Sequence, residues 1–429
     1  MTNSKITQMC CFCLIGIFSV LISNLYAQQT KSNKDGGPIR RQSTETKPIN
    51  KQHRDVFSNP EHTVFFSNNF SGGAFSRLTT VNDTAYRILI EPENLPINSS
   101  PWYAFKVWST MPKTIHITLE YVKGKRHRYA PKISSDGKNW KLLEKPYAGD
   151  REKDGSYRFK LDISKDTTWI SAQPLLTVAH VNQWTDSLLK LDIGAKKEVI
   201  GESRNKRPLE VVKIGNPKSK RAIVLITRQH PPEVTGHQAF MAFVETLIQN
   251  NAQAKAFRKN FMIYLFPMVN PDGVEEGFWR HNAGGVDLNR DWEDFNQPET
   301  RAIRDYLKKD ISADRQVNLF IDFHSIWSKD LYYTLQDTVP RNTSGILKAW
   351  LSHLEKTFPE YKMVVKPVFS SPPPYPAFAS FGYFYETYKA EAVIYEISDN
   401  TPKDFIVAKA KASAEKLMEL LLQEAHKSK

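Results

Sequence analysis

The sequence predicts an α/β protein with a mixed, mainly parallel sheet flanked by helices, preceded by an all-β sandwich domain. Two observations support this fold class. From about residue 181 onward, apolar runs typical of buried strands alternate with helical segments. Before that point, short runs of alternating apolar and polar residues follow one another without a helical period between them. The chain has 429 residues, a length that favours two domains.

The segment 56–180 is expected to form the β-sandwich domain. Turn-forming pairs such as Asp136-Gly137 separate its strand-like runs. These runs are Tyr86–Ile90, Trp102–Trp108, Thr114–Val122 and Tyr157–Ile163. The second of them carries several aromatic side chains, which could mark a carbohydrate-binding surface. Alternation along a strand favours a place in the core instead.

The segment 181–429 is expected to form the α/β domain. Its strand-like runs are Leu209–Ile214, Ala222–Thr227, Phe261–Phe266, Val317–Phe323 and Ala392–Ile397. Its helical segments include Gln238–Gln249, Pro298–Leu307, Ser344–Lys356 and Lys403–Ala425. Acidic and metal-ligand residues fall at or just beyond the ends of these strands. Ligand sites of open α/β sheets gather at the carboxyl ends of strands, so this segment should contain the functional site.

The N-terminal residues are typical of an exported protein. Lys5 precedes an apolar stretch from Met9 to Ile22, and polar residues follow Ala27. We expect a signal peptide over 1–27, a disordered polar leader over 28–55, and a periplasmic or extracellular mature chain without a membrane span. All three cysteines lie within the apolar stretch, so the mature protein should contain no disulfide.

The net charge of +13 has two interpretations. It could attract an anionic partner such as a cell envelope, or it could reflect a generally basic surface. Lysines and arginines are scattered, and no recognised nucleic-acid-binding motif accompanies them. We therefore expect no nucleic-acid partner, and the sequence leaves the oligomeric state open.

Two histidines and two glutamates follow apolar runs in a pattern that suits a metal. His230 and Glu233 lie three residues apart just beyond one run, His324 ends another, and Glu396 ends a third. Two histidines and one glutamate are the protein ligands that leave a catalytic zinc ion one open position. A further carboxylate can act as general base for the water bound there. The pattern predicts one zinc ion per chain and a hydrolytic reaction.

Further polar residues between these ligands suit the same chemistry. Asp287 is a candidate partner of His230, because metal-binding histidines usually donate their second N–H to a carboxylate. Arg290 offers a planar fork for a carboxylate, and Asn289 adds a donor. Arg280 would suit a developing oxyanion. Taken alone, each of the charged residues could be part of a surface ion pair, and for Arg280 alone this interpretation is favoured.

In this order the residues resemble the motif series of the zinc metallocarboxypeptidases, and most of all the cytosolic-carboxypeptidase-like branch. The matching motifs are His230-x-x-Glu233, Asn270-Pro-Asp-Gly273, Arg280, Asp287-Leu-Asn-Arg290, Asp322-Phe-His324 and Tyr395-Glu396. They span about residues 209–399. In isolation, Asn270-Pro-Asp-Gly273 reads only as a turn.

The resemblance implies a role for each matching residue. His230, Glu233 and His324 would bind zinc, and Glu396 would act as general base and proton shuttle. Arg280 would stabilise the oxyanion. Asn289 and Arg290 would clamp the terminal carboxylate of a peptide substrate.

Two parts of the family pattern are poorly matched. The family carries a mobile tyrosine about twenty residues before the glutamate, and Tyr375 stands there between prolines. Tyr383 and Tyr385 are rivals for that substrate-binding role. Near the expected specificity position stands Phe381-Gly382, which carries no charge, and Glu386 could favour a basic group or lie on the surface.

Three functions remain open on sequence grounds. The first is a zinc carboxypeptidase that removes C-terminal residues from peptides. The second is a related zinc amidase or deacylase acting on N-acyl amino acids or cell-wall peptides. The third is a binding protein that keeps the fold without catalysis. The presence of every expected ligand and of the base favours an enzyme.

Overall fold

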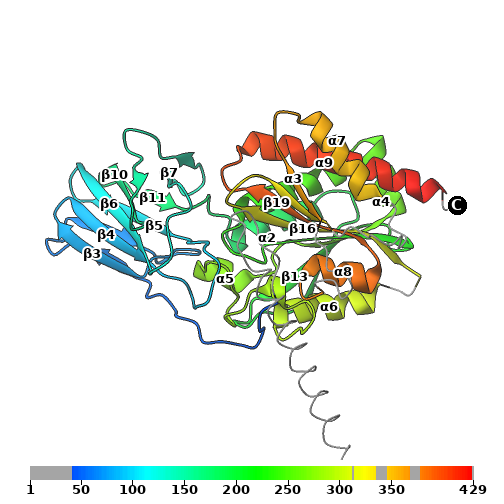
Figure 1. Cartoon of the computed structure of the whole chain (residues 1–429), viewed down its shortest axis with the longest axis horizontal. Helices are drawn as coiled ribbons and strands as arrows, with labels where there is room; N and C mark the ends of the chain where they lie inside the picture. The colour runs from blue at the N-terminus through cyan, green and yellow to red at the C-terminus, as the bar shows by residue number, and fades with distance from the viewer. Residues whose placement is uncertain (1–40, 312–313, 335–344, 368–376, 428–429) are drawn as a thin grey trace, which may run out of the picture. The chain divides into compact units, whose positions relative to one another are not determined.

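A computed structural model describes residues 41–311, 314–334, 345–367 and 377–427 (Figure 1). The expected signal peptide over 1–27 therefore lies outside the described residues, as does the first part of the expected leader. Within the described ranges, no helix is both long enough and apolar enough to cross a membrane.

The first part of the described chain is rich in β-structure and forms two sheets. One sheet has the strand order β1-β2-β5-β11-β7-β8, formed by Val56–Ser58, Val64–Ser67, Ala104–Ser109, Thr168–Ser171, Lys132–Ser134 and Lys141–Leu142. The other has the order β3-β4-β6-β10-β9, formed by Arg77–Asn82, Ala85–Ile90, Lys113–Tyr121, Tyr157–Ile163 and Asp150–Arg151. Side chains from both sheets join one hydrophobic core, as in a sandwich.

Alternation along the strands explains this core. In β10 every second side chain is buried, and β10 pairs with β6 in an antiparallel register. In the aromatic run around β5, Trp102, Tyr103 and Phe105 are buried, whereas Trp108 is half-buried and stacks on Phe65 with ring centroids 5.5 Å apart. The core interpretation is confirmed for Trp102, Tyr103 and Phe105 but not for Trp108.

Residues 41–55, which the sequence analysis placed in a disordered leader, form an ordered extended segment. The backbone N–H of Lys47 donates to the carbonyl of Gly284 at 2.8 Å, and the side-chain amide of Gln297 donates to the carbonyl of Thr44 at 2.7 Å. In both bonds the segment contributes a backbone group, so a polar composition does not exclude order here. Composition alone could not reveal this segment.

The second part of the chain is an eight-stranded mixed sheet, as expected for the α/β fold class. The strand order is β12-β13-β15-β14-β16-β19-β17-β18, with bounds Lys196–Glu202, Pro208–Gly215, Met262–Phe266, Arg221–Thr227, Gln316–Ile326, Glu391–Ser398, Leu331–Thr334 and Val364–Pro367. The four central strands, β15, β14, β16 and β19, run parallel to one another. They are nearly all buried, because helices cover both faces of the sheet.

Helices α3, α7 and α9 lie over one face of the sheet, and α6 and α8 lie over the other (Figure 1). The helices have the bounds α2 Val178–Leu189, α3 Val234–Leu247, α4 Ala252–Asn260, α5 Pro271–Glu276, α6 Pro298–Asp310, α7 Ile346–Thr357, α8 Ser380–Tyr388 and α9 Lys403–Lys427. Helices α3, α6, α7 and α9 correspond to the four helical segments expected from the sequence.

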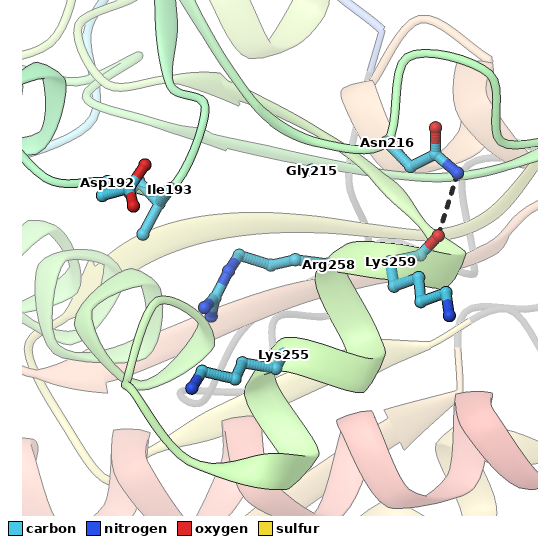
Figure 2. A pocket seen from close by; sticks show the side chains of 7 residues that line it. All are labelled: Asp192, Ile193, Gly215, Asn216, Lys255, Arg258 and Lys259. Carbon is cyan, nitrogen blue, oxygen red and sulfur yellow. Dashed lines mark hydrogen bonds between the residues drawn. The ribbon is translucent and has the colours of Figure 1, made fainter.

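The candidate site residues with described positions do not lie at the amino-terminal ends of the parallel strands. At the amino-terminal end, Figure 2 shows a shallow pocket beside α4, lined in part by Lys255, Arg258 and Lys259. The Arg258 guanidinium donates to the carbonyl of Leu247 at 2.6 Å and so holds the end of α3. All the candidate site residues with described positions lie elsewhere, and His324 and Glu396 lie toward the carboxyl ends of their strands.

Candidate metal centre and surrounding site

His230 and Glu233 lie in the connection between β14 and α3. Strand β14 ends at Thr227, and Glu233 is the residue before the first turn of α3. Both side chains are buried, with exposed fractions of 3% and 6%. The Nδ1 atom of His230 lies 2.8 Å from Oε1 of Glu233. The short spacing His-x-x-Glu thus brings both groups to one point.

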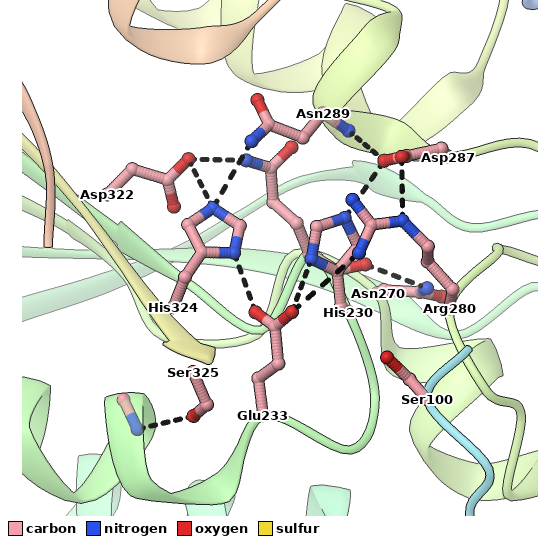
Figure 3. A network of polar contacts seen from close by, with 12 residues as sticks. Ser100, His230, Glu233, Asn270, Arg280, Asp287, Asn289, Asp322, His324 and Ser325 are labelled. Atoms are coloured by element: carbon pink, nitrogen blue, oxygen red, sulfur yellow. Dashed lines mark hydrogen bonds and ion pairs between the residues drawn. The ribbon is translucent and has the colours of Figure 1, made fainter. Parts of the chain in front are cut away.

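His324 joins them from the neighbouring strand. Strands β14 and β16 pair in parallel, so the carboxyl end of β16 lies beside the connection that carries His230. The Nδ1 atom of His324 lies 2.6 Å from Oε2 of Glu233. One ligand atom from each of the three residues lies within 4.8 Å of the others. Figure 3 shows the carboxylate of Glu233 between the two imidazole rings.

The other nitrogen of each imidazole is held by an aspartate. The Nε2 atom of His230 lies 2.9 Å from Oδ1 of Asp287, and Nε2 of His324 lies 2.8 Å from Oδ2 of Asp322. These carboxylates fix the ring orientations and leave both Nδ1 atoms facing Glu233. Two Nδ1 atoms and one carboxylate match the donor set of a catalytic zinc site, so the residues present fit this metal.

The charges of these groups are strongly coupled. Burial raises the pKa of Glu233, but the positive charges of His230 and His324 outweigh it and hold this pKa well below its usual value. For His324, burial lowers the pKa, while the charges of Asp322 and Glu233 raise it well above its usual value. Glu233 is therefore favoured in its ionised form, and the buried carboxylates favour the protonated form of His324.

Replacing Asp322 with asparagine is expected to weaken zinc binding by about 10- to 100-fold, because His324 loses a charged partner for its Nε2–H. A competition titration against a chromophoric chelator measures this change. Asp310→Asn is the matched control, since Asp310 accepts hydrogen bonds from Tyr264 and Lys213 outside the metal centre. An unchanged zinc affinity in Asp322→Asn would show that Asp322 does not support zinc binding.

Glu396 lies on β19, directly beside His324 in the parallel register of β16 and β19. Its Oε2 atom is buried and has no hydrogen-bond partner among the described residues. Burial raises the pKa of Glu396 to about 8, while the charges of His324 and Arg280 act in the opposite direction. A bound divalent cation would add a further lowering influence. This carboxylate is thus available to a ligand or water molecule.

Arg280 and Asp287 form an ion pair at the edge of the centre. The Nε atom of Arg280 donates to Oδ2 of Asp287 at 2.8 Å, and its Nη1 atom lies 3.9 Å from Oε1 of Glu233. Burial raises the pKa of Asp287, but Arg280, Arg290 and His230 together hold it well below its usual value. Asp287 therefore links His230 to Arg280, and its pairing with His230 is the one that the sequence predicted.

Asn289 and Arg290 belong to the short 3-10 helix Leu288–Arg290. Both polar side-chain atoms of Asn289 already have polar contacts. Oδ1 accepts a hydrogen bond from the backbone N–H of Ser380 at 3.0 Å, and Nδ2 lies 3.4 Å from Nε2 of His324. Arg290 donates from Nη1 to the carbonyl of Asn289 at 2.8 Å, and its buried Nε atom has no partner among the described residues. Arg290 is the freer of the two donors.

A family model described as zinc carboxypeptidase matches residues 181–426. The chain belongs to the zinc carboxypeptidase family. This family consists of zinc-dependent hydrolases of peptide bonds, and the metal-centre geometry above agrees with that membership.

Two curated relatives are cytosolic carboxypeptidases. Cytosolic carboxypeptidase 3 of Bos taurus is 22% identical over 304 residues, which are 63% of this chain and 30% of the relative. Cytosolic carboxypeptidase 6 of Caenorhabditis elegans is 24% identical over 319 residues, which are 68% of this chain and 69% of the relative. The chain thus spans less than a third of the length of the bovine protein.

Solved structures of similar fold include bacterial metallo-carboxypeptidases. The enzyme from Burkholderia cenocepacia has a TM-score of 0.68 at 18% identity, over 84% of this chain and 99% of that chain. The enzyme from Pseudomonas aeruginosa, in complex with (2-guanidinoethylmercapto)succinic acid, has a TM-score of 0.68 at 19% identity, over 83% of this chain and 98% of that chain. Because the match extends over most of this chain, the fold likeness includes the β-rich region.

The motif Asn270-Pro-Asp-Gly273 of this zinc carboxypeptidase family member is more than the turn it resembles in isolation. Pro271 opens the short helix α5, and the side chain of Asn270 caps it by accepting from the N–H of Gly273 at 2.9 Å. The Asn270 amide also donates to the carbonyls of Gln229 and His281, at 3.1 and 3.0 Å. It thereby connects the segments that carry His230 and Arg280.

The three tyrosines considered for the substrate-binding role are placed as follows. Tyr375 lies outside the described residues. Tyr383 is buried against Trp292 and Phe295, with ring centroids 5.7 and 5.1 Å apart, and therefore serves the core. Tyr385 is also buried, with an exposed fraction of 3%.

Neither candidate for substrate selection presents an unpaired charge among the described residues. Glu386 forms an ion pair with Lys389 at 3.3 Å near the protein surface. Phe381 is fully buried. The described residues around α8 therefore reveal no charged selector.

Sequence reasoning missed several polar residues that support the zinc carboxypeptidase centre. Gln229 and Ser380 both donate to Oδ2 of Asp322, and Glu93 contacts the backbone beside Arg280. Gln229 stands next to His230, so its position offered a clue. Glu93 stands far from the motifs in the sequence and offered none.

Proposed function

We propose that this protein is a zinc-dependent metallocarboxypeptidase that hydrolyses the C-terminal amide bond of peptides. The observation that carries the proposal is one buried cluster that contains a zinc-type ligand set, the partner-free carboxylate oxygen of Glu396 and two arginines. Family membership supports the hydrolytic part of the proposal. The arginines support a substrate with a free carboxylate, because a guanidinium matches that group in shape and charge.

Zinc, when bound by His230, Glu233 and His324, would polarise the scissile carbonyl and acidify the attacking water molecule. Glu396 would accept the proton of that water and pass it to the leaving amine, a transfer favoured by its place beside His324. Among the described residues, Oε2 of Glu396 and Nε of Arg290 have no hydrogen-bond partner that substrate or water would need to displace.

The two arginines would divide the remaining work. Arg280, held by Asp287 and close to Glu233, would donate to the oxygen that becomes negative in the transition state. Arg290, whose Nε has no partner in the described part of the chain, would bind the terminal carboxylate, and Asn289 would assist once its amide shifts from its present contacts. This assignment requires substrates with an unblocked C-terminus.

The deciding experiment is digestion of peptides by the zinc-loaded protein, with the products identified by mass spectrometry. N-terminally blocked dipeptides and N-acyl amino acids are assayed in parallel. Release of C-terminal residues from peptides is the expected result, and Glu396→Gln purified identically controls for contaminating peptidases. Cleavage restricted to N-acyl amino acids would replace the proposal by a zinc amidase.

Replacing Arg290 with alanine is expected to weaken substrate capture more than turnover, because the charged fork for the terminal carboxylate is lost. KM should rise by about 10- to 100-fold, the equivalent of roughly 1.5–3 kcal/mol for a hydrogen bond to a charged group. Steady-state kinetics on free and C-terminally amidated peptides measures this effect. Arg304→Ala, at an exposed pair with Asp305, is the control. An unchanged preference for the free carboxylate would contradict the clamp role.

We also propose that the protein is exported after removal of residues 1–27. The charged start, the apolar stretch from Met9 to Ile22 and Ala27 support this proposal. N-terminal sequencing of protein from fractionated cells tests it, and a cytoplasmic protein that keeps the apolar stretch would contradict it.

A further inference from the structure

Glu93 of the β-rich region contacts the backbone of the segment that carries Arg280. It lies in the loop that follows β4, and its exposed fraction is 2%. Its carboxylate accepts hydrogen bonds from three consecutive backbone N–H groups: Trp279 at 2.8 Å, Arg280 at 3.0 Å and His281 at 2.6 Å. One side chain thus fixes the peptide groups on both sides of Arg280.

This arrangement meets a specific need of the buried segment. Residues 279–281 belong to no helix or strand, so these N–H groups have no partner within regular secondary structure. Buried backbone donors require an acceptor, and a concave row of N–H groups suits an anion. A carboxylate satisfies all three donors through charge-assisted bonds, which are stronger than neutral ones.

Asn94 extends the same contact along the chain. Its Oδ1 atom lies 2.6 Å from Nδ1 of His281, and its amide donates to the carbonyl of Gly285 at 3.0 Å. Gly285 lies two residues before Asp287, which pairs with the Arg280 guanidinium. The loop therefore holds both the start and the end of the segment whose side chains form the Arg280–Asp287 pair.

The β-rich region also holds the other side of the site. Arg128 donates from Nε to Asp399 at 2.8 Å and from Nη1 to the hydroxyl of Ser100 at 2.8 Å. Asp399 follows Glu396 by three residues. The segments that carry Arg280 and Glu396 are thus each anchored by a charged residue of the β-rich region.

We propose that Glu93 is a positioning residue for catalysis, which sets the placement of the Arg280 guanidinium through three backbone hydrogen bonds. This inference rests on the proposed function, because it assigns Arg280 to the transition state. It also makes the β-rich region a structural component of the active site. A misplacement of about 1 Å at such a donor can cost about 100-fold in rate.

The test is a double-mutant cycle between Glu93→Gln and Arg280→Ala, measured in the full zinc-loaded protein. Glutamine keeps the size of the side chain but removes its charge and offers one acceptor oxygen instead of two. We expect kcat to fall by about 10- to 100-fold in Glu93→Gln with KM nearly unchanged. In the Arg280→Ala background, Glu93→Gln should change kcat less than about twofold, because its effect passes through Arg280.

Glu275→Gln is the matched control. Glu275 accepts a hydrogen bond from Ser71 of the β-rich region at 2.8 Å, so its replacement disturbs a contact with the same region away from Arg280. This variant should keep the kcat of the original protein. An additive effect of Glu93→Gln and Arg280→Ala would overturn the inference, as would an equal loss of kcat in Glu275→Gln.

Zinc content and melting temperature are recorded for each variant. If Glu93→Gln does not fold, Glu93→Asp takes its place in the cycle, since aspartate keeps the charge but is too short to reach all three donors. If the original protein is active and a folded Glu93 variant keeps a normal kcat, only the positioning role of Glu93 is refuted. An original protein that cleaves no peptide would instead refute the proposed function.

Discussion

Replacement of Glu396 by glutamine is expected to reduce peptide hydrolysis by several orders of magnitude while zinc remains bound. The carboxylate lies on β19 beside His324 but is not one of the three residues that converge as ligands. Glutamine has a similar size and cannot accept and release a proton at neutral pH. Loss of general acid–base catalysis alone accounts for about 100- to 10,000-fold in rate.

The measurement combines kcat on a C-terminally free peptide with zinc content by atomic absorption. Glu386→Gln is the matched control, because Glu386 forms an ion pair with the exposed Lys389. Near-normal turnover in Glu396→Gln would show that another group is the base. Loss of zinc from this variant would show that Glu396 contributes to metal binding.

Replacement of Glu233 by glutamine is expected to have the second-largest effect, by removing the metal. Glu233 supplies the only negative charge among the three candidate ligands, and both of its oxygens lie within 2.8 Å of a histidine Nδ1 atom. Loss of a residue that supports a ligand costs about 10- to 100-fold in metal affinity, so loss of the charged ligand itself should exceed ~100-fold.

Isothermal titration of the metal-free variant with zinc measures this loss, and activity should disappear at micromolar zinc. Glu245→Gln is the control, since Glu245 accepts from the Trp184 indole on the outer side of α3 and should leave zinc binding unchanged. Full zinc occupancy in Glu233→Gln would exclude Glu233 as a ligand.

Much of the fold and the site could be predicted because the informative residues stand next to strong local patterns. His230 and His324 follow or end apolar runs, and parallel neighbouring strands bring such positions together. The strand and helix periods of the α/β region are equally local. The proximity of the metal-ligand residues could therefore be predicted from their places at the ends of parallel strands.

The remaining features depend on contacts between distant parts of the chain. Glu93 lies 186 to 188 positions from its backbone partners, and nothing in the residues around it indicates them. The ordered segment 41–55 is held by backbone and side-chain contacts with distant residues, such as Lys47 with Gly284 and Arg41 with Asp294, which a polar composition does not reveal. The capped helix α5 depends on Asn270 as an N-cap, a role that the turn-like sequence Asn-Pro-Asp-Gly conceals.

The position of Asp287 between His230 and Arg280 has a thermodynamic consequence. One of its oxygens contacts the imidazole and the other contacts the guanidinium. The positive charge of a metal bound at His230 would therefore act on Arg280 through a single shared carboxylate. If a bound metal changes the affinity for an anion at Arg280 by some factor, then the bound anion must change the affinity for the metal by the same factor. Metal binding and the binding of an anion at Arg280 should therefore be treated as coupled equilibria in this protein.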